Sequence, residues 1–397
     1  MSLSSVQPSP SVSRPVPDPD SSEFADLLQQ LSEEFAATAA YYDRHSEFPH
    51  ANLQRLHQHG LLALTVPRAL GGSEANLAQA RRVIGAVARG EPSTALVLVM
   101  QYLQHTRLQQ NTAWPLHLRQ RVAREAVQEG ALINALRVEP DLGTPARGGL
   151  PATLARRVEG GWLLSGRKIY STGIPGLTWL AVWARSDEAE PQVGTWLVHR
   201  DSPGISVEET WDHLGMRATG SHEVIFEDVQ LPPESAVDVH PLDRQPGLDA
   251  AAVAAFQGDN AILLAALYDG VARAARDDLL GWLARRVPGS LGAPLSSLPR
   301  VQEAVGRIDA LLLSSRLQLR GSDDPALSVG ELGQIKVNVI DNAIDAVRRG
   351  LELAGNHALE HANPLQRHYR NLLCGRVHTP QPDSVWLAAG KAAFATF

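Results

Sequence analysis

The sequence predicts a mainly α-helical protein that carries a β-barrel in its middle. Apolar residues at helical spacing dominate both ends of the chain, whereas short β-rich runs separated by glycine turns dominate the middle. We therefore divide the 397 residues into a tail (1–22), an N-terminal α-helical domain (23–132), a middle antiparallel β-barrel (133–245) and a C-terminal four-helix bundle (246–397).

The tail is rich in serine, proline and aspartate. It has neither the basic start nor the apolar run of a signal peptide, so we expect it to be disordered. Apolar residues recur every three or four positions from Phe24 onward, which predicts helix. The stretch from Ala78 to Leu108 is alanine-rich and apolar on several faces, and helix within it should be largely buried.

Strand-like runs begin after about residue 132 and are separated by Gly160-Gly161, Gly173 and Pro203-Gly204. They cover 153–158, 162–165, 179–184, 195–199 and 223–229, and the last of them alternates as a half-buried strand should. Helical patterns return at 250–286, 299–320 and 331–358, with a Pro/Gly-rich connection at 288–299. Their lengths and short connections predict an antiparallel bundle.

Composition excludes several classes of function. The net charge of −7 offers no basic patch for nucleic acid, and we expect no apolar run long enough to span a membrane. The single cysteine, Cys374, excludes an intrachain disulfide and a cysteine-rich metal site. We therefore expect a cytoplasmic protein with no bound metal.

Three stretches occur in the order typical of the acyl-CoA dehydrogenase superfamily, which the sequence resembles from about Phe24 to its end. The third is the most specific, because a Gly-x-Arg turn and a Phe-Glu-Asp-Val strand occur at family spacing. The stretches are Phe48-Pro49 with Gly60-Leu-Leu-Ala-Leu-Thr-Val-Pro67 and Gly71-Gly72; Glu139-Pro140 to Gly143-Thr144 with Gly166-Arg-Lys168-Ile-Tyr-Ser-Thr172-Gly173; and Leu214-Gly-Met-Arg217 to Phe226-Glu-Asp-Val229-Gln-Leu-Pro232.

The resemblance implies the same three-part fold, with a flavin between the barrel and the bundle. It also implies a homodimer or homotetramer, a small-molecule or acyl-CoA-like substrate, and either a flavin reductase or an electron-transfer flavoprotein as partner. The cofactor is FAD, or FMN or reduced flavin supplied by a reductase.

The resemblance also assigns flavin-binding positions. Thr172 falls on the residue that meets flavin N5, although a strand-end Ser-Thr pair can equally cap a turn. Val138 stands where a threonine usually bonds the ring, and Glu352 and Asn356 replace a glutamine and a glycine, which leaves FMN open beside FAD. The full set of assigned positions is Val138, Gly143, Thr144, Tyr170, Ser171, Thr172, Arg285, Glu352, Gly355, Asn356, Gln381 and Asp383.

Arg285, with Arg286 as an equal alternative, would pair with the flavin pyrophosphate across a subunit interface, since a guanidinium binds phosphate with two parallel bonds. A solvated charge at a helix end is the alternative interpretation. Pro288 stands where the family has an aromatic residue, which argues against adenine stacking. Gly355 can also be read as an ordinary helix cap.

The position of the family's catalytic glutamate is the main departure. An ungapped match places Thr379 there, and a hydroxyl is too weak a base to remove an α-proton at neutral pH. His378 precedes it, as in the superfamily's flavin monooxygenases such as dibenzothiophene monooxygenase, where an imidazole can hydrogen-bond or protonate an oxygen species. His105 lies near a second histidine of those enzymes; a packed helix residue is its alternative role.

Some relatives carry the glutamate on an earlier helix, and that position matches Asn260, with Asp259 adjacent. Asp259 is therefore a candidate base, or else a helix cap. Three hypotheses follow. The first is reduced-flavin monooxygenase chemistry, which needs a separate reductase because the chain has no Gly-x-Gly-x-x-Gly fingerprint. The second is acyl-CoA α,β-dehydrogenation with Asp259 as base, and the third is a non-catalytic flavin-binding relative.

Overall fold

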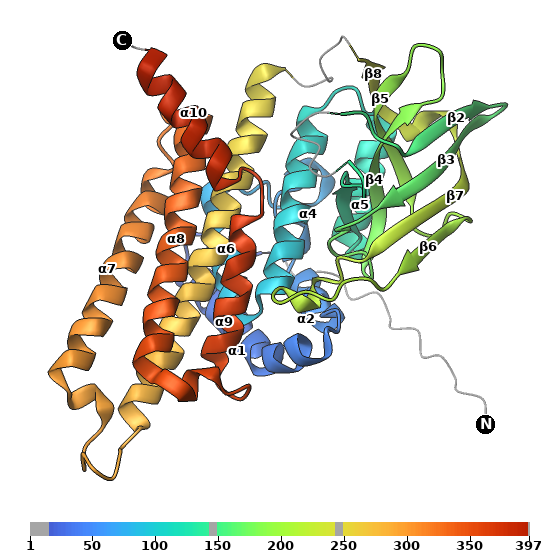
Figure 1. The fold of residues 1–397 in the computed structure, drawn as a ribbon. Coiled ribbons are helices and arrows are strands. Elements are labelled where there is room, and N and C mark those ends of the chain that lie inside the picture. Colours follow the sequence, from blue (N-terminus) through green and yellow to red (C-terminus); the bar gives the residue numbers. More distant parts are fainter. Residues whose placement is uncertain (1–15, 143–148, 243–248, 396–397) are drawn as a thin grey trace, which may run out of the picture.

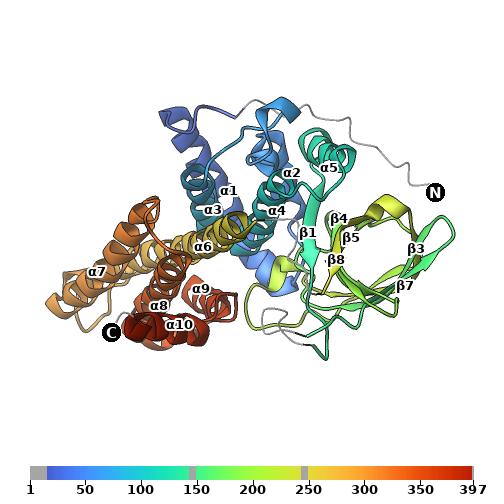
Figure 2. The same cartoon turned by 90° about the horizontal axis from the view of Figure 1, so that it is seen from above.

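The computed structural model describes residues 16–142, 149–242 and 249–395 (Figure 1). The predicted order of helical, β and helical segments is confirmed. Figure 2 shows the curled sheet on one side of the molecule and the helices gathered on the other. The candidate site lies where these two parts meet.

The N-terminal helices owe their boundaries to local capping. Ser21 accepts a bond from the amide of Phe24, and Asn76 forms a reciprocal capping box with Gln79. The break within the predicted stretch 78–108 comes at Glu91-Pro92, because Glu91 caps the next helix and Pro92 opens it. The helices are α1 (Ser22–His45), α2 (His50–Gln58), α3 (Leu77–Gly90), α4 (Pro92–Gln110) and α5 (Leu116–Glu129).

The middle segment forms one eight-stranded sheet in the order β6-β7-β3-β2-β4-β5-β8, with β1 beside β4. Its pairings are mostly antiparallel, but β1 and β2 each run parallel to β4, so the sheet is mixed where we expected it to be antiparallel. The strands are β1 (Leu132–Leu136), β2 (Leu154–Val158), β3 (Gly161–Lys168), β4 (Leu177–Ser186), β5 (Gln192–His199), β6 (Ile205–Glu208), β7 (Glu223–Leu231) and β8 (Ala236–Pro241).

The C-terminal helices pack around one long central helix, α6, which also contacts α3 and α4. The bundle is therefore continuous with the N-terminal helices through one apolar core. Its helices are α6 (Ala250–Arg285), α7 (Pro299–Gly321), α8 (Val329–Ala354), α9 (Pro364–Leu373) and α10 (Pro382–Ala395). The predicted helix at 331–358 ends at Ala354, because Gly355 adopts a left-handed φ of 61°.

One expectation about α6 was wrong. By length and composition, this helix alone among the described ones could cross a membrane. Our expectation of no such run failed because α6 is long and rich in alanine and leucine. The same residues pack against α3, α4, α8 and α9 inside the fold, which accounts for their apolar character.

Candidate active site

The barrel side of the site is built by the segment that follows β3. The amide of Ile169 donates to the carbonyl of Val138 at 2.9 Å, so these two segments lie side by side. Asn134 Nδ2 donates to the carbonyl of Thr172 at 3.0 Å. The structure therefore brings the predicted residues Val138, Tyr170, Ser171 and Thr172 together at one edge of the sheet.

A row of hydroxyls connects this edge to the bundle. Thr172 Oγ1 lies 3.0 Å from Ser221 Oγ, which lies 2.8 Å from Thr219 Oγ1. Thr219 bonds the carbonyl of Met216, whose amide in turn donates to Asn371 Oδ1 of α9 at 2.7 Å. The predicted flavin segment and the helix that leads to His378 are thus joined by one continuous hydrogen-bonded path.

Tyr170 adopts an unusual conformation at this edge. Its φ is 56°, in the left-handed region that bulky residues avoid at a cost of about 1–3 kcal/mol. Its side chain is 53% exposed and meets Trp211 and His213 edge to face. Strain that persists at an exposed aromatic ring is typical of a residue that is positioned for a ligand.

On the bundle side, a buried lysine holds the loop that carries His378. Lys336 of α8 is fully buried, and its Nζ donates to the carbonyls of Gly375, His378 and Pro380 at 3.2, 2.7 and 2.9 Å. All three ammonium donors are therefore satisfied by this one loop. Burial lowers the pKa of Lys336 to about 8.

His378 presents an unpartnered nitrogen. Its Nε2 is buried without a hydrogen-bond partner, and so is the hydroxyl of Tyr268, whose ring lies 6.0 Å from the imidazole. Burial, and then the charge of Lys336, lowers the pKa of His378 to about 4, so the ring is neutral at physiological pH. Unpartnered buried groups are rare, and two neighbouring ones indicate a place where a ligand or water completes the bonding.

The two alternative positions for a catalytic carboxylate meet in space. Asn260 Nδ2 donates to the carbonyl of Thr379 at 2.8 Å, which places α6 beside the loop. Asp259 lies inside α6, whose actual cap is Asp249, so the cap interpretation of Asp259 was wrong. Burial raises the pKa of Asp259 to about 6.

His105 is held in a separate network on α4. Its Nε2 lies 3.0 Å from Gln101 Nε2, and Gln101 also bonds Ala131 and Ile133 at the start of β1. Burial lowers the pKa of His105 to about 4. These contacts give His105 a packing role at the junction of α4 and β1, and none of them joins it to His378.

The predicted adenosine-side residues lie at the opposite end of the bundle. Arg285 is exposed at the end of α6, about 39 Å along the helix from Asp259 at 1.5 Å per residue. Glu352 pairs with Arg348, and Gly355 and Asn356 follow at the end of α8. Within one copy of the chain, Arg285 is therefore far from Asp259 and the loop that carries His378.

The remaining predicted positions lie elsewhere. Gly143 and Thr144 lie outside the described residues. Gln381 and Asp383 lie at the start of α10, where Gln381 Nε2 donates to the carbonyl of Val377 at 3.2 Å. The C-terminal part of the loop and the first turn of α10 therefore form one side of the region around His378.

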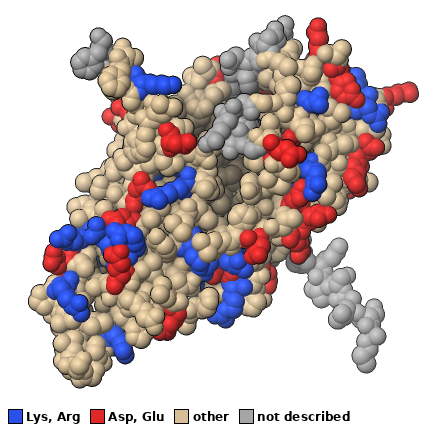
Figure 3. Space-filling view, viewed as in Figure 1, with Lys and Arg blue, Asp and Glu red and all other residues tan. Residues whose placement is uncertain are grey.

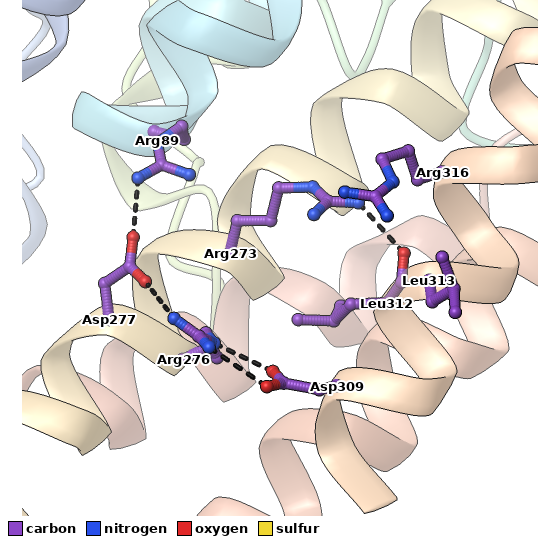
Figure 4. Close-up of a pocket in the computed structure, with 8 residues that line it drawn as sticks. All are labelled: Arg89, Arg273, Arg276, Asp277, Asp309, Leu312, Leu313 and Arg316. Atoms are coloured by element: carbon purple, nitrogen blue, oxygen red, sulfur yellow. Dashed lines mark hydrogen bonds and ion pairs between the residues drawn. The ribbon is translucent and has the colours of Figure 1, made fainter. Parts of the chain in front are cut away.

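A cavity of about 460 Å³ lies away from this site, between α3, α6 and α7 (Figure 4). Its arginines are mostly neutralised: Arg89 bonds Asp277 at 2.6 Å, and Arg276 bonds Asp309 through two nitrogens. These ion pairs join α3 to α6 and α6 to α7, so we assign them a structural role.

Sequence reasoning missed Lys336 and Tyr268. A signal existed for Lys336, because it is one of only three lysines in the chain and stands among apolar residues of α8. Tyr268 gave no such signal, since a tyrosine in an apolar helix is ordinary. The Arg370-Asn371 pair was part of the resemblance to the flavin monooxygenases, but the bond between Asn371 and Met216 could not be predicted from it.

The residues present fit a flavin. Figure 3 shows the surface hollowed between bundle and barrel. The barrel supplies the exposed ring of Tyr170 and the hydroxyl row, and the bundle side supplies the unpartnered Nε2 of His378. Such groups suit a planar heteroaromatic ligand. Among the described residues, no cluster of three or more potential metal ligands occurs. The fold and the site together define a flavin-dependent oxidoreductase.

The chain belongs to the acyl-CoA dehydrogenase family. The family's N-terminal, middle and C-terminal domains match residues 18–110, 137–229 and 262–380. The chain is 32% identical over 379 residues to a putative acyl-CoA dehydrogenase, YdbM, of Bacillus subtilis (strain 168). The matched region covers 94% of this chain and 97% of YdbM. It is 30% identical to L-evernosamine nitrososynthase of a Micromonospora species, over 92% of this chain and 89% of that protein.

A solved structure of KijD3 with FMN and a dTDP-linked amino sugar superposes with a TM-score of 0.77 at 29% identity, covering 93% of this chain and 92% of that one. Butyryl-CoA dehydrogenase of Megasphaera elsdenii has a TM-score of 0.81 at 18% identity, covering 94% and 97% of the two chains, which shows the shared fold alone. The chain is therefore a flavoprotein oxidoreductase of this family.

Proposed function

We propose that the protein is a reduced-flavin-dependent monooxygenase. The observation that carries this proposal is the pair His378-Thr379. The threonine occupies the position matched to the family's glutamate, and the preceding histidine presents a buried, unpartnered Nε2. A carboxylate base is absent from that position, and a neutral hydrogen-bonding group takes its place.

A bound flavin would supply two-electron redox chemistry, including reaction of its reduced form with oxygen. His378 supplies what that chemistry needs from the protein. With a pKa of about 4, the imidazole stays neutral at pH 7 and can donate or accept one hydrogen bond at Nε2. The burial of His378 Nε2 and of the whole Tyr268 side chain keeps bulk water away from these two groups.

The relatives support the same proposal. Nitrososynthases that are 30–32% identical are named for producing nitroso groups on amino sugars, and KijD3 was solved with FMN. We infer that FMN is the flavin to test first and that amines are the first substrate class to test. A separate flavin reductase would deliver the electrons, and a homodimer or homotetramer would bring Arg285 to a neighbouring flavin.

A second candidate function is α,β-dehydrogenation of an acyl-CoA thioester. The observation that favours it is the position of Asp259, next to the residue that bonds the carbonyl of Thr379. Burial raises its pKa only to about 6, so the carboxylate is mostly ionised above pH 7 and could remove a proton. An electron-transfer flavoprotein would then be the partner.

The test compares the two functions in one protein. The chain is loaded anaerobically with reduced FMN and mixed with oxygenated buffer, and the flavin absorbance is followed in the wild type, His378→Asn and Asp259→Asn. The proposal expects reoxidation in the wild type to be delayed relative to free FMN, and the delay to shorten in His378→Asn only. The dehydrogenase would be established by two results together. Reduced flavin would reoxidise immediately in all three proteins, and short acyl-CoA thioesters would bleach oxidised FAD in the wild type but not in Asp259→Asn.

A further inference from the structure

A small cavity of about 70 Å³ lies between α4 and the outer face of β1, β4 and β5. Its polar wall is formed by Gln104, Arg107, Arg137, Thr195 and Asp238. It lies next to the candidate active site along the chain, because Arg137 directly precedes Val138.

Two polar groups of this wall, Gln104 and Arg137, have few partners among the described residues. Gln104 is 7% exposed, and within the described part of the chain its amide makes no hydrogen bond. The Arg137 guanidinium lies 5.5 Å from the centroid of the Trp183 ring and makes no hydrogen bond or ion pair with another described residue. Arg107 lies over the ring of Phe256 and makes a long ion pair of 3.8 Å with Asp238. The arginines of the cavity in Figure 4 mostly make ion pairs at 2.6–3.0 Å instead.

The charge in this region is positive. Asp238 is the one carboxylate of the lining, and it already accepts a bond from Asn111 Nδ2 at 2.7 Å. The pKa of Arg137 is lowered to about 10, first by desolvation and then by the charge of Arg107, so the two cations lie within electrostatic reach. The Arg137 side chain keeps solvent contact at the cavity mouth, which limits the cost of holding both charges.

We propose that this cavity binds an oxyanion, a phosphate or carboxylate group, between Arg107 and Arg137, with the Gln104 amide as a third donor. Guanidinium groups bind both anions through parallel N–H···O bonds, and the volume suits one such group. The group belongs either to the substrate, which is then an anionic molecule, or to the flavin phosphate. The inference rests on the proposed position of the site and is independent of the choice between oxygen chemistry and dehydrogenation.

The first test titrates inorganic phosphate into the full-length protein and follows binding by calorimetry and thermal shift. Arg107→Met and Arg137→Met should each weaken binding about tenfold or more, because each removes a charge-assisted pair. Arg137→Lys keeps the positive charge but loses the forked guanidinium, so its phosphate affinity should lie between that of Arg137→Met and that of the wild type. Arg316→Met is the matched control, since Arg316 is an exposed arginine in the cavity of Figure 4 and lacks an ion pair within the described residues.

The source of the oxyanion is tested with two flavins. If Arg137→Met weakens FMN binding and spares riboflavin, the cavity holds the flavin phosphate. If both flavins bind as in the wild type while phosphate binding is lost, the cavity serves an anionic substrate. The proposal is overturned if the wild type shows no phosphate binding, or if Arg316→Met weakens phosphate binding as much as Arg137→Met does. Oxygen reactivity is not read in either test, so failure here leaves the proposed function standing.

Discussion

Replacing Lys336 by methionine tests whether the loop geometry around His378 is imposed by one buried ammonium group. Methionine fills similar space but donates no hydrogen bond, so the carbonyls of Gly375, His378 and Pro380 each lose a donor. An unsatisfied buried acceptor costs about 1–3 kcal/mol. Against this loss, the methionine variant no longer has to bury a charged group, which avoids a desolvation cost of several kcal/mol. We expect a net loss of about 3 kcal/mol in the free energy of unfolding, which lowers the Tm by about 4 °C for a chain of this length.

The effect on activity should exceed the effect on folding. A displacement of about 1 Å at a reacting group can cost on the order of 100-fold in rate, so Lys336→Met should slow substrate turnover about 10- to 100-fold while the folded fraction stays high. The charge of Lys336 is also the second cause of the low pKa of His378. Its removal should therefore move the acid limb of the pH–rate profile to higher pH, which a merely structural role would not do.

The assay pairs urea unfolding with rate measurements from pH 4 to 8 on the wild type, Lys336→Met and Lys391→Met. Lys391 is an exposed lysine of α10 and serves as the matched control. The reasoning is refuted if Lys336→Met keeps the wild-type rate and the wild-type acid limb, because the loop would then hold His378 without the ammonium group.

Three other predictions follow from buried charges. Asp259→Asn should leave the oxygen reaction within about twofold of the wild type, measured by flavin absorbance; a much larger loss would make this carboxylate part of the oxygen chemistry. Lys168→Met should cost about 3–5 kcal/mol in urea unfolding, because Glu139, bonded to Lys168 Nζ at 2.6 Å, would stay buried without its cation; an unchanged midpoint would contradict this. Stability should fall as pH drops from 6.5 to about 4, because the unfolded chain protonates His105 and His378 while the fold keeps both neutral. The expected loss in the free energy of unfolding is on the order of 3 kcal/mol for fully buried His105 and less for partly exposed His378. Replacing both histidines by glutamine should flatten the dependence of Tm on pH in thermal melts.

The fold could be predicted because its signals are local. Capping residues such as Ser21 and Asn76, and glycine turns such as Gly160-Gly161, act within a few residues of where they stand. The mixed pairing of the sheet could not be predicted in the same way. Whether β1 lies parallel or antiparallel to β4 depends on a contact between segments more than 40 residues apart, and alternation along a strand carries no information about direction.

The candidate site shows the same difference between local signals and long-range contacts. The resemblance assigned Val138 and Thr172 to one flavin, and in the structure Val138 pairs with Ile169, three residues before Thr172; their contact with a flavin stays a prediction. The predicted helix at 250–286 already placed Asp259 in a helix interior, and the structure agrees, so the cap alternative conflicted with that prediction. Motif order could not find the proposed oxyanion cavity, since Gln104 lies on a helix and Arg137 just after a strand, and which sides of these segments face each other is fixed only by packing.

The contact between Asn260 and Thr379 explains how chemistry can change at this site without a change of fold. These residues are 119 positions apart, yet one side chain bonds the backbone of the other. A carboxylate placed at either position would reach the same region, so the proposed match of both positions to the family's glutamate is compatible with one shared site. In this chain both positions are uncharged, and Asp259 is the residue next to Asn260 in sequence. The loop is nevertheless held by Lys336, by the Arg376–Asp341 pair and by Asn260. A loop that had lost its function would not be expected to keep a buried cation with three satisfied donors, so its rigidity argues that His378 is the group being held in place.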